Sequence, residues 1–131
     1  MRKILLTLVI AFAALSLQAA NKLTTVYMCG FAASFNDSTV YFTTLQKVDS
    51  AYIDSKTKFL YSRENYSYQL RDYLSNHGVP NYTCATIFAL SRKAAEKKYA
   101  KLRKRYIQGG KYTVKDITQN DFMFLPIKEQ E

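Results

Sequence analysis

Few residues in this chain could do acid–base or nucleophilic chemistry, since it has one histidine and two cysteines. A histidine beside a thiol can activate it as a nucleophile, so His77 with Cys84 is the pair that would suit a small hydrolase or transferase. A structural zinc site needs about four nitrogen or sulfur ligands, which these residues do not supply. No glycine-rich loop or nucleophile elbow is present either. We therefore expect capping or packing for His77, no catalytic residue, no metal and no cofactor.

The two cysteines leave two interpretations open. Cys29 and Cys84 both lie in strand-like segments. In an oxidising compartment such a pair can form a disulfide, which would contribute about 2–4 kcal/mol. Their apolar neighbours fit two free buried thiols equally well. A redox function is not indicated, because the chain has no Cys-x-x-Cys motif.

Carboxylates are the other candidates for chemistry, because a pair of them can act as acid and base. Asp49, Asp54 and Glu64 lie close together in the sequence. Their spacing does not place two of them on one wall of a cleft. We interpret them as solvated turn residues.

The strongest charge signal is a basic helix. Eight of the 19 lysines and arginines lie between Arg92 and Arg105. Apolar residues recur there at helical spacing, which predicts one stripe packed on a sheet. The opposite side and one flank would carry Lys93, Lys97, Lys101, Lys104 and Arg105. This pattern is typical of a contact with an anionic polymer, a membrane surface or a protein partner. The alternative is a solvated helix face.

The elements around this helix are the most clearly marked in the sequence. An apolar run at Cys84–Leu90 predicts a buried strand. Ser91 is a natural N-cap, and the helix is expected to end at Tyr106 or Ile107, before Gly109-Gly110. A short strand at Lys111–Lys115 completes a strand–helix–strand unit.

The rest of the chain predicts a hairpin, a second helix and a last strand. We expect the segment Gln46–Ser62 to be mostly irregular. The other elements are strands at Thr24–Ala33 and Thr39–Leu45, a helix at Asn65–Asn76 with Asn65 as N-cap, and a strand at Phe122–Leu125. The predicted fold is α+β, in the order β-β-α-β-α-β-β. We expect a two-layer sandwich, with one mixed sheet of four to five strands and both helices on one face.

The N-terminus has the pattern of a secretory signal peptide. Arg2 and Lys3 precede an apolar run of about a dozen residues, which ends in small residues at Ala19 and Ala20. The expected organisation is a signal peptide at 1–20 and a single domain at 21–131. Removal of the signal peptide takes away Arg2 and Lys3 and leaves 17 basic and 10 acidic residues. We expect export to the periplasm or the extracellular space, with no transmembrane segment in the mature chain and nucleic acid unlikely as a partner.

Two stretches carry a resemblance. They are KLTTVYMCGFAASFNDSTVYFTTLQKVDSAYIDSKTKFL at 22–60 and ENYSYQLRDYL at 64–74. The chain resembles uncharacterised small exported proteins of Gram-negative gut bacteria. That resemblance implies export and one compact domain, and it brings no functional residues. The sequence thus favours a non-enzymatic envelope binding domain, with a small Cys/His-dependent hydrolase or transferase, or an inhibitor-like protein pairing through a sheet edge, as alternatives.

Overall fold

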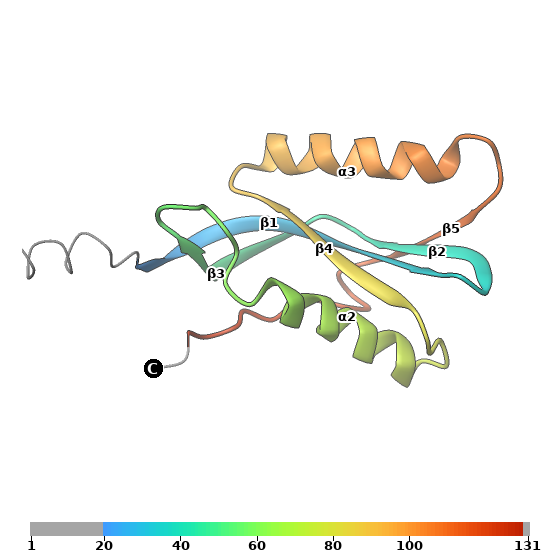
Figure 1. Cartoon of the computed structure of the whole chain (residues 1–131), viewed down its shortest axis with the longest axis horizontal. Coiled ribbons are helices and arrows are strands. Elements are labelled where there is room, and N and C mark those ends of the chain that lie inside the picture. The colour runs from blue at the N-terminus through green and yellow to red at the C-terminus, as the bar shows by residue number, and fades with distance from the viewer. Residues whose placement is uncertain (1–19, 130–131) are drawn as a thin grey trace, which may run out of the picture.

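The computed structural model describes residues 20–129, which form one mixed sheet of five strands and two helices (Figure 1). The elements are β1 (Asn21–Ser34), β2 (Asp37–Thr43), β3 (Gln46–Asp54), α2 (Arg63–Asn76), β4 (Thr83–Ala89), α3 (Arg92–Ile107) and β5 (Thr113–Ile117). The predicted α+β class is confirmed, but the order is β-β-β-α-β-α-β. The predicted signal peptide lies outside the described residues, apart from Ala20. No helix within residues 20–129 is both long and apolar enough to cross a membrane.

Strand β1 is the centre of the sheet. Its residues 21–28 pair with β3 and its residues 31–34 pair with β2, both antiparallel. Strand β4 pairs with residues 27–33, which overlap both sets, so β4 must use the opposite edge of β1. Strand β5 joins β2 in parallel, with Thr39 opposite Thr113. Across the sheet the order is therefore β4, β1, then β2 in line with β3, then β5.

The two helices cover opposite faces of the sheet (Figure 1), whereas the sequence predicts both on one face. Gly30 of β1 faces α2, because a Cβ at this position would lie 2.7 Å from Cδ2 of Leu70. The next residue, Phe31, points the other way, and its ring centroid lies 4.7 Å from that of Tyr106 on α3. Adjacent side chains of a strand project to opposite faces. The fold accordingly has three layers instead of two.

The direction of the two connections explains this arrangement. Helix α2 carries the chain from β3 past β1 to β4, and α3 carries it back past β1 and β2 to β5. Each connection joins parallel strands, and almost all such crossover connections are right-handed. Two right-handed crossovers that run across the sheet in opposite directions place their helices on opposite faces. A single-face arrangement would require both crossovers to move across the sheet in the same direction.

The larger core lies between the sheet and α2. Its centre is Gly30, whose missing side chain lets Leu70 and Phe124 approach the strand. The buried cluster on this side includes Val26, Met28, Ala32, Val48, Ile53, Tyr66, Leu70, Leu74, Phe122 and Phe124. Phe122 and Phe124 come from the segment after β5, so the C-terminal segment completes this core.

That C-terminal segment is extended but joins no strand, so the predicted strand at Phe122–Leu125 is wrong. Two glutamine side chains bind its backbone instead. Buried Gln46 donates from Nε2 to Phe122 O (2.8 Å) and accepts at Oε1 from Phe124 N (2.9 Å). Gln69 of α2 makes the same pair of bonds, each 2.9 Å, with Leu125. A side-chain amide offers one donor and one acceptor group, as a peptide unit does, so the glutamines replace a neighbouring strand.

The stretch expected to be irregular contains β3. Val48 and Ala51 are both buried, although they are an odd number of residues apart. A register shift between Thr24 and Val26 of β1 accounts for this, because a bulge breaks the alternation of inward and outward side chains. The same shift hides the strand from a search for period-two patterns.

Two predicted boundaries also move. Helix α2 begins at Arg63, and its N-cap is Ser62 in a left-handed conformation (φ 57°). Asn65 lies inside the first turn, where its Nδ2 donates to Ser62 Oγ (2.8 Å). The last strand is Thr113–Ile117 instead of Lys111–Lys115, because it pairs with β2 only from Thr113 onward.

We predict that Gly30→Ala destabilises the protein by about 1–3 kcal/mol, the usual cost of overpacking a core. The added methyl group would collide with Leu70. Urea unfolding measures the change. The double variant Gly30→Ala with Leu70→Ala should lose less than the sum of the single losses, because the smaller residue 70 makes room. If the loss of unfolding free energy in the double variant equals the sum of the two single losses, the close approach of Leu70 to Gly30 is contradicted.

Candidate functional site

Helix α3 presents the basic surface, and its ends form as the sequence predicts. Ser91 is the N-cap, and its Oγ accepts from Ala94 N (3.2 Å). The helix ends at Ile107. Gly109 and Gly110 follow with φ of 89° and 63°, a region that costs glycine little. These signals fix the length and the start of the helix.

The inward stripe of α3 fixes its rotation about its axis. Ala95 is buried against the sheet. The ring of Tyr99 packs edge-on against Phe42, with centroids 5.8 Å apart. Tyr106 contacts Phe31 in the same layer. Aromatic contacts in the middle and at the C-terminal end of the stripe therefore set which residues point outward.

The outward side carries the five cations that the sequence singles out. All of them are exposed, namely Lys93, Lys97, Lys101, Lys104 and Arg105. Within residues 20–129 none of the five forms an ion pair. Two other cations of the helix are neutralised, since Arg92 pairs with Glu96 (3.2 Å) and Arg103 donates to both carboxylate oxygens of Asp116. The five side chains lie together, and their role in binding stays a prediction.

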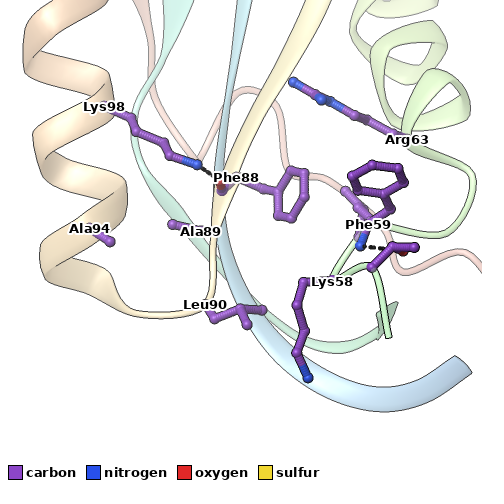
Figure 2. Close-up of a pocket in the computed structure, with 10 residues that line it drawn as sticks. Lys58, Phe59, Arg63, Phe88, Ala89, Leu90, Ala94 and Lys98 are labelled. Carbon is purple, nitrogen blue, oxygen red and sulfur yellow. Dashed lines mark hydrogen bonds between the residues drawn. The ribbon is translucent and has the colours of Figure 1, made fainter. Parts of the chain in front are cut away.

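A hollow of about 660 Å³ lies beside the N-terminal half of α3, between that helix and the loop that joins β3 to α2 (Figure 2). Its walls are mainly apolar, and Phe59 and Leu90 are 70 % and 45 % exposed there. Its cations are Lys58, Arg63 and Lys98, and none of the acidic residues within positions 20–129 lines it. The hollow could accept an apolar group that carries a negative charge.

Two of these cations cap the open edge of β4. Arg63 donates from Nε and Nη2 to Thr86 O (2.9 and 2.7 Å), and Lys98 donates from Nζ to Phe88 O (3.1 Å; Figure 2). Both charged groups also lie near the Phe88 ring, at 5.3 and 5.7 Å from its centroid. Capped carbonyls cannot pair with an added strand, so these residues protect the edge.

A shallower hollow of about 260 Å³ continues along α3 from Lys98. Ile87 and Leu102 form its apolar part, and Lys101 and Arg105 border it. The two hollows share Lys98. Basic side chains thus follow one flank of α3 from Lys98 to Arg105.

His77 does not meet a nucleophile. It is the C-cap of α2, and its Nδ1 lies 2.7 Å from Tyr73 O in the preceding turn. Its ring packs on that of Tyr73, with centroids 4.2 Å apart. This is the capping and packing role that the sequence favours.

The cysteines are free thiols, and a Cys29–Cys84 disulfide is excluded by the sheet. Cys84 lies opposite Ala32 and Cys29 opposite Ile87 in the β1–β4 ladder. Paired residues share a face, so the odd spacing of Cys29 and Ala32 sends the two thiols to opposite faces. Burial raises the pKa of Cys29 to about 12 and that of Cys84 to about 11. Neither is an activated thiolate.

The candidate carboxylates act locally. Asp54 Oδ1 accepts from Lys56 N and Thr57 N (2.8 Å each), and the Thr57 bond is the main cause that lowers its pKa. Asp49 lies in β3, exposed beside Lys47 (3.6 Å). Among residues 20–129, no group of three His, Cys, Asp or Glu side chains could hold a metal ion.

Sequence reasoning missed the hollow. Phe59 lay in a segment without a clear pattern, and Phe88 lay in a run that predicts a strand covered on both faces. Whether a strand is an edge strand depends on the sheet order, which no local pattern encodes. The one available signal was Lys98, which the helical spacing places on a flank of α3.

Comparison with known proteins adds no family. A scan against protein-family models finds no match. Searches of curated proteins and of solved structures also find no similar protein. The proposals that follow rest on the residues and geometry of this chain.

We predict that both thiols resist modification in the native protein at neutral pH. Their raised pKa values lower the thiolate fraction below that of an exposed cysteine, and burial restricts access. Labelling with a maleimide should be slow in buffer and complete in urea without a reductant. Labelling that needs a reductant would reveal a disulfide and contradict the geometry.

We also predict that Arg63→Ala with Lys98→Ala promotes self-association. The double variant frees two carbonyls on the edge of β4 for pairing with a second chain. Sedimentation velocity should show more dimer or larger species than the wild type. A matched control is Arg71→Ala with Lys97→Ala, which removes the same charge from the same two helices at residues that donate no hydrogen bond to β4 within residues 20–129. Equal behaviour of the two double variants would exclude edge capping.

Proposed function

We propose that this chain is an exported, non-enzymatic binding domain of the bacterial envelope that contacts an anionic component through α3. The observation that carries this proposal is the set of five exposed cations on α3, none of them paired within residues 20–129. Unpaired charges of one sign on one surface reinforce each other's potential and attract polyanions. The assignment to the envelope rests on the predicted signal peptide.

The position of the charges argues against helix stability as their only role. Lys104 and Arg105 lie in the last turn of α3, where the helix dipole favours cations. In the first turn, where the dipole disfavours cations, Arg92 pairs with Glu96, but Lys93 has no ion-pair partner within residues 20–129 and no acidic residue of α3 lies in that turn. A helix selected only for stability would have the opposite distribution at its start. An anionic ligand explains cations at both ends.

The alternatives draw less support from the site. A Cys/His hydrolase would need an activated thiol, whereas burial raises both thiol pKa values and His77 lies against its own helix. An inhibitor that pairs through a sheet edge would find the β4 edge capped by Arg63 and Lys98. An acidic protein partner would use the same cations as an envelope polymer, and the experiment below includes it.

We predict that Lys97→Glu with Lys104→Glu abolishes sedimentation with anionic vesicles and with cell-wall sacculi. The change reverses two of the five charges and leaves the inward stripe of α3 intact. Binding of the wild type should also weaken as salt rises, because exposed charges are screened beyond about 10 Å at 0.1 M salt.

The matched control is Lys22→Glu with Lys56→Glu, which makes the same change of net charge at exposed positions outside α3. This control should sediment like the wild type. If wild type sediments with neither material and binds only an acidic protein captured from the envelope, the partner is that protein. If both double variants bind equally well, α3 is not the contact surface.

A further inference from the structure

The turn between β1 and β2 carries a side chain that the fold does not use. The hairpin turn consists of Phe35 and Asn36, and Phe35 is fully exposed. Two-residue hairpin turns favour glycine, asparagine or aspartate, whose backbones adopt the required conformations. A phenylalanine at the tip neither helps the turn nor packs on the core. Its apolar surface is available to a partner.

Two further apolar residues are exposed at the same end of the molecule. Tyr112 and Ile107 are 42 % and 53 % exposed. Phe35 and Tyr112 line one shallow hollow of about 290 Å³ together with Tyr106, so the hairpin tip and the loop from α3 to β5 are neighbours. Figure 1 shows the tip of the hairpin and this loop at one end of the sheet.

Three exposed cations adjoin the apolar residues of this end in the sequence. Lys104 and Arg105 precede Ile107 in the last turn of α3, and Lys111 precedes Tyr112. None of these three cations forms an ion pair within the described part of the chain. Of the acidic residues nearest in sequence, Asp116 binds Arg103. Asp37 is exposed at the start of β2 and keeps its negative charge while it accepts from Thr39 N (3.0 Å), so the three cations exceed this one carboxylate. Exposed apolar residues with unpaired cations next to them match the interface of an anionic bilayer, where hydrocarbon lies beneath charged head groups.

We infer that this end of the protein docks on an anionic phospholipid bilayer, with Phe35 inserted into the interface beside Ile107 and Tyr112. Lys104 and Arg105 in the last turn of α3 then contact the lipid head groups. This inference rests on the proposed function and names its target. A soluble polyanion or a cell-wall polymer would use the charges, but it offers no apolar layer for Phe35. The hairpin tip is therefore the feature that selects the bilayer.

The chain itself provides a clean reporter, because it contains no tryptophan. Phe35→Trp introduces a single fluorophore at the proposed point of insertion. Vesicles of phosphatidylglycerol should shift its emission to shorter wavelength and protect it from an aqueous quencher. Vesicles of phosphatidylcholine should do neither, because they lack the negative charge.

The matched control is Leu23→Trp. Leu23 is also an exposed apolar residue, but it lies near the start of β1, at the other end of the sheet from the tip that follows β1. Its emission should not change when the protein binds phosphatidylglycerol vesicles. An equal shift at both positions would overturn the proposed orientation.

A second variant tests the contribution of the tip to affinity. Phe35→Ser should weaken binding to phosphatidylglycerol vesicles by roughly tenfold, because the variant has no aromatic side chain to move from water into the bilayer interface. Retention on a heparin column should stay the same, since the cations are unchanged. Phe35 is fully exposed, so a thermal melt should confirm that the fold is intact.

The outcomes separate this inference from the proposed function. If the protein sediments with phosphatidylglycerol vesicles but the emission of Trp at position 35 does not shift, contact is electrostatic only. Insertion is then wrong and the proposed function stands. If the wild type binds sacculi or an acidic protein but no vesicles, the bilayer is the wrong target. If it binds no anionic material, both proposals fail.

Discussion

The alternation of side chains along β1 is the constraint on which the structure depends. This one strand pairs with three others and supplies side chains to both cores. Gly30 admits α2 on one face, and Phe31 contacts α3 on the other. The position of one helix relative to the other is thus set only through β1 and its neighbouring strands. A slip of one residue in its pairing would exchange the two cores, which differ in size and in composition.

The two helices cooperate at one place, the free edge of β4. Arg63 reaches it from α2 and Lys98 from α3, one from each layer. Each cation donates a hydrogen bond to a carbonyl oxygen of β4 and also lies close to the Phe88 ring. Positive charge at this edge therefore has a structural explanation. The helix dipole favours Lys104 and Arg105 in the last turn of α3. The five cations on the outward side of α3 have no ion-pair partner within residues 20–129, which is why they carry the functional proposal.

Local signals predicted what depends on neighbours in sequence. The cap at Ser91, the end of α3 before Gly109 and the inward stripe at Ala95 and Tyr99 were all legible, because helix ends and helical spacing are local. Strand β3 was not, because a bulge between Val48 and Ala51 broke its own alternation. The face of each helix and the separation of the cysteines follow from the order of the strands. That order depends on contacts between distant segments, so neither the edge hollow nor the grouping of Phe35 with Tyr112 was predictable.

The way in which the C-terminal segment is bound has a consequence for the order of folding. Gln46 reaches Phe122 across 76 positions of the chain and Gln69 reaches Leu125 across 56. These two glutamines lie on different elements, so their amides converge only after sheet and helix have assembled. Contacts that close such long loops form late and open first. Residues 122–127 should thus behave as a separate cooperative unit, whose backbone amides exchange hydrogen before those of β1 while the sheet stays intact.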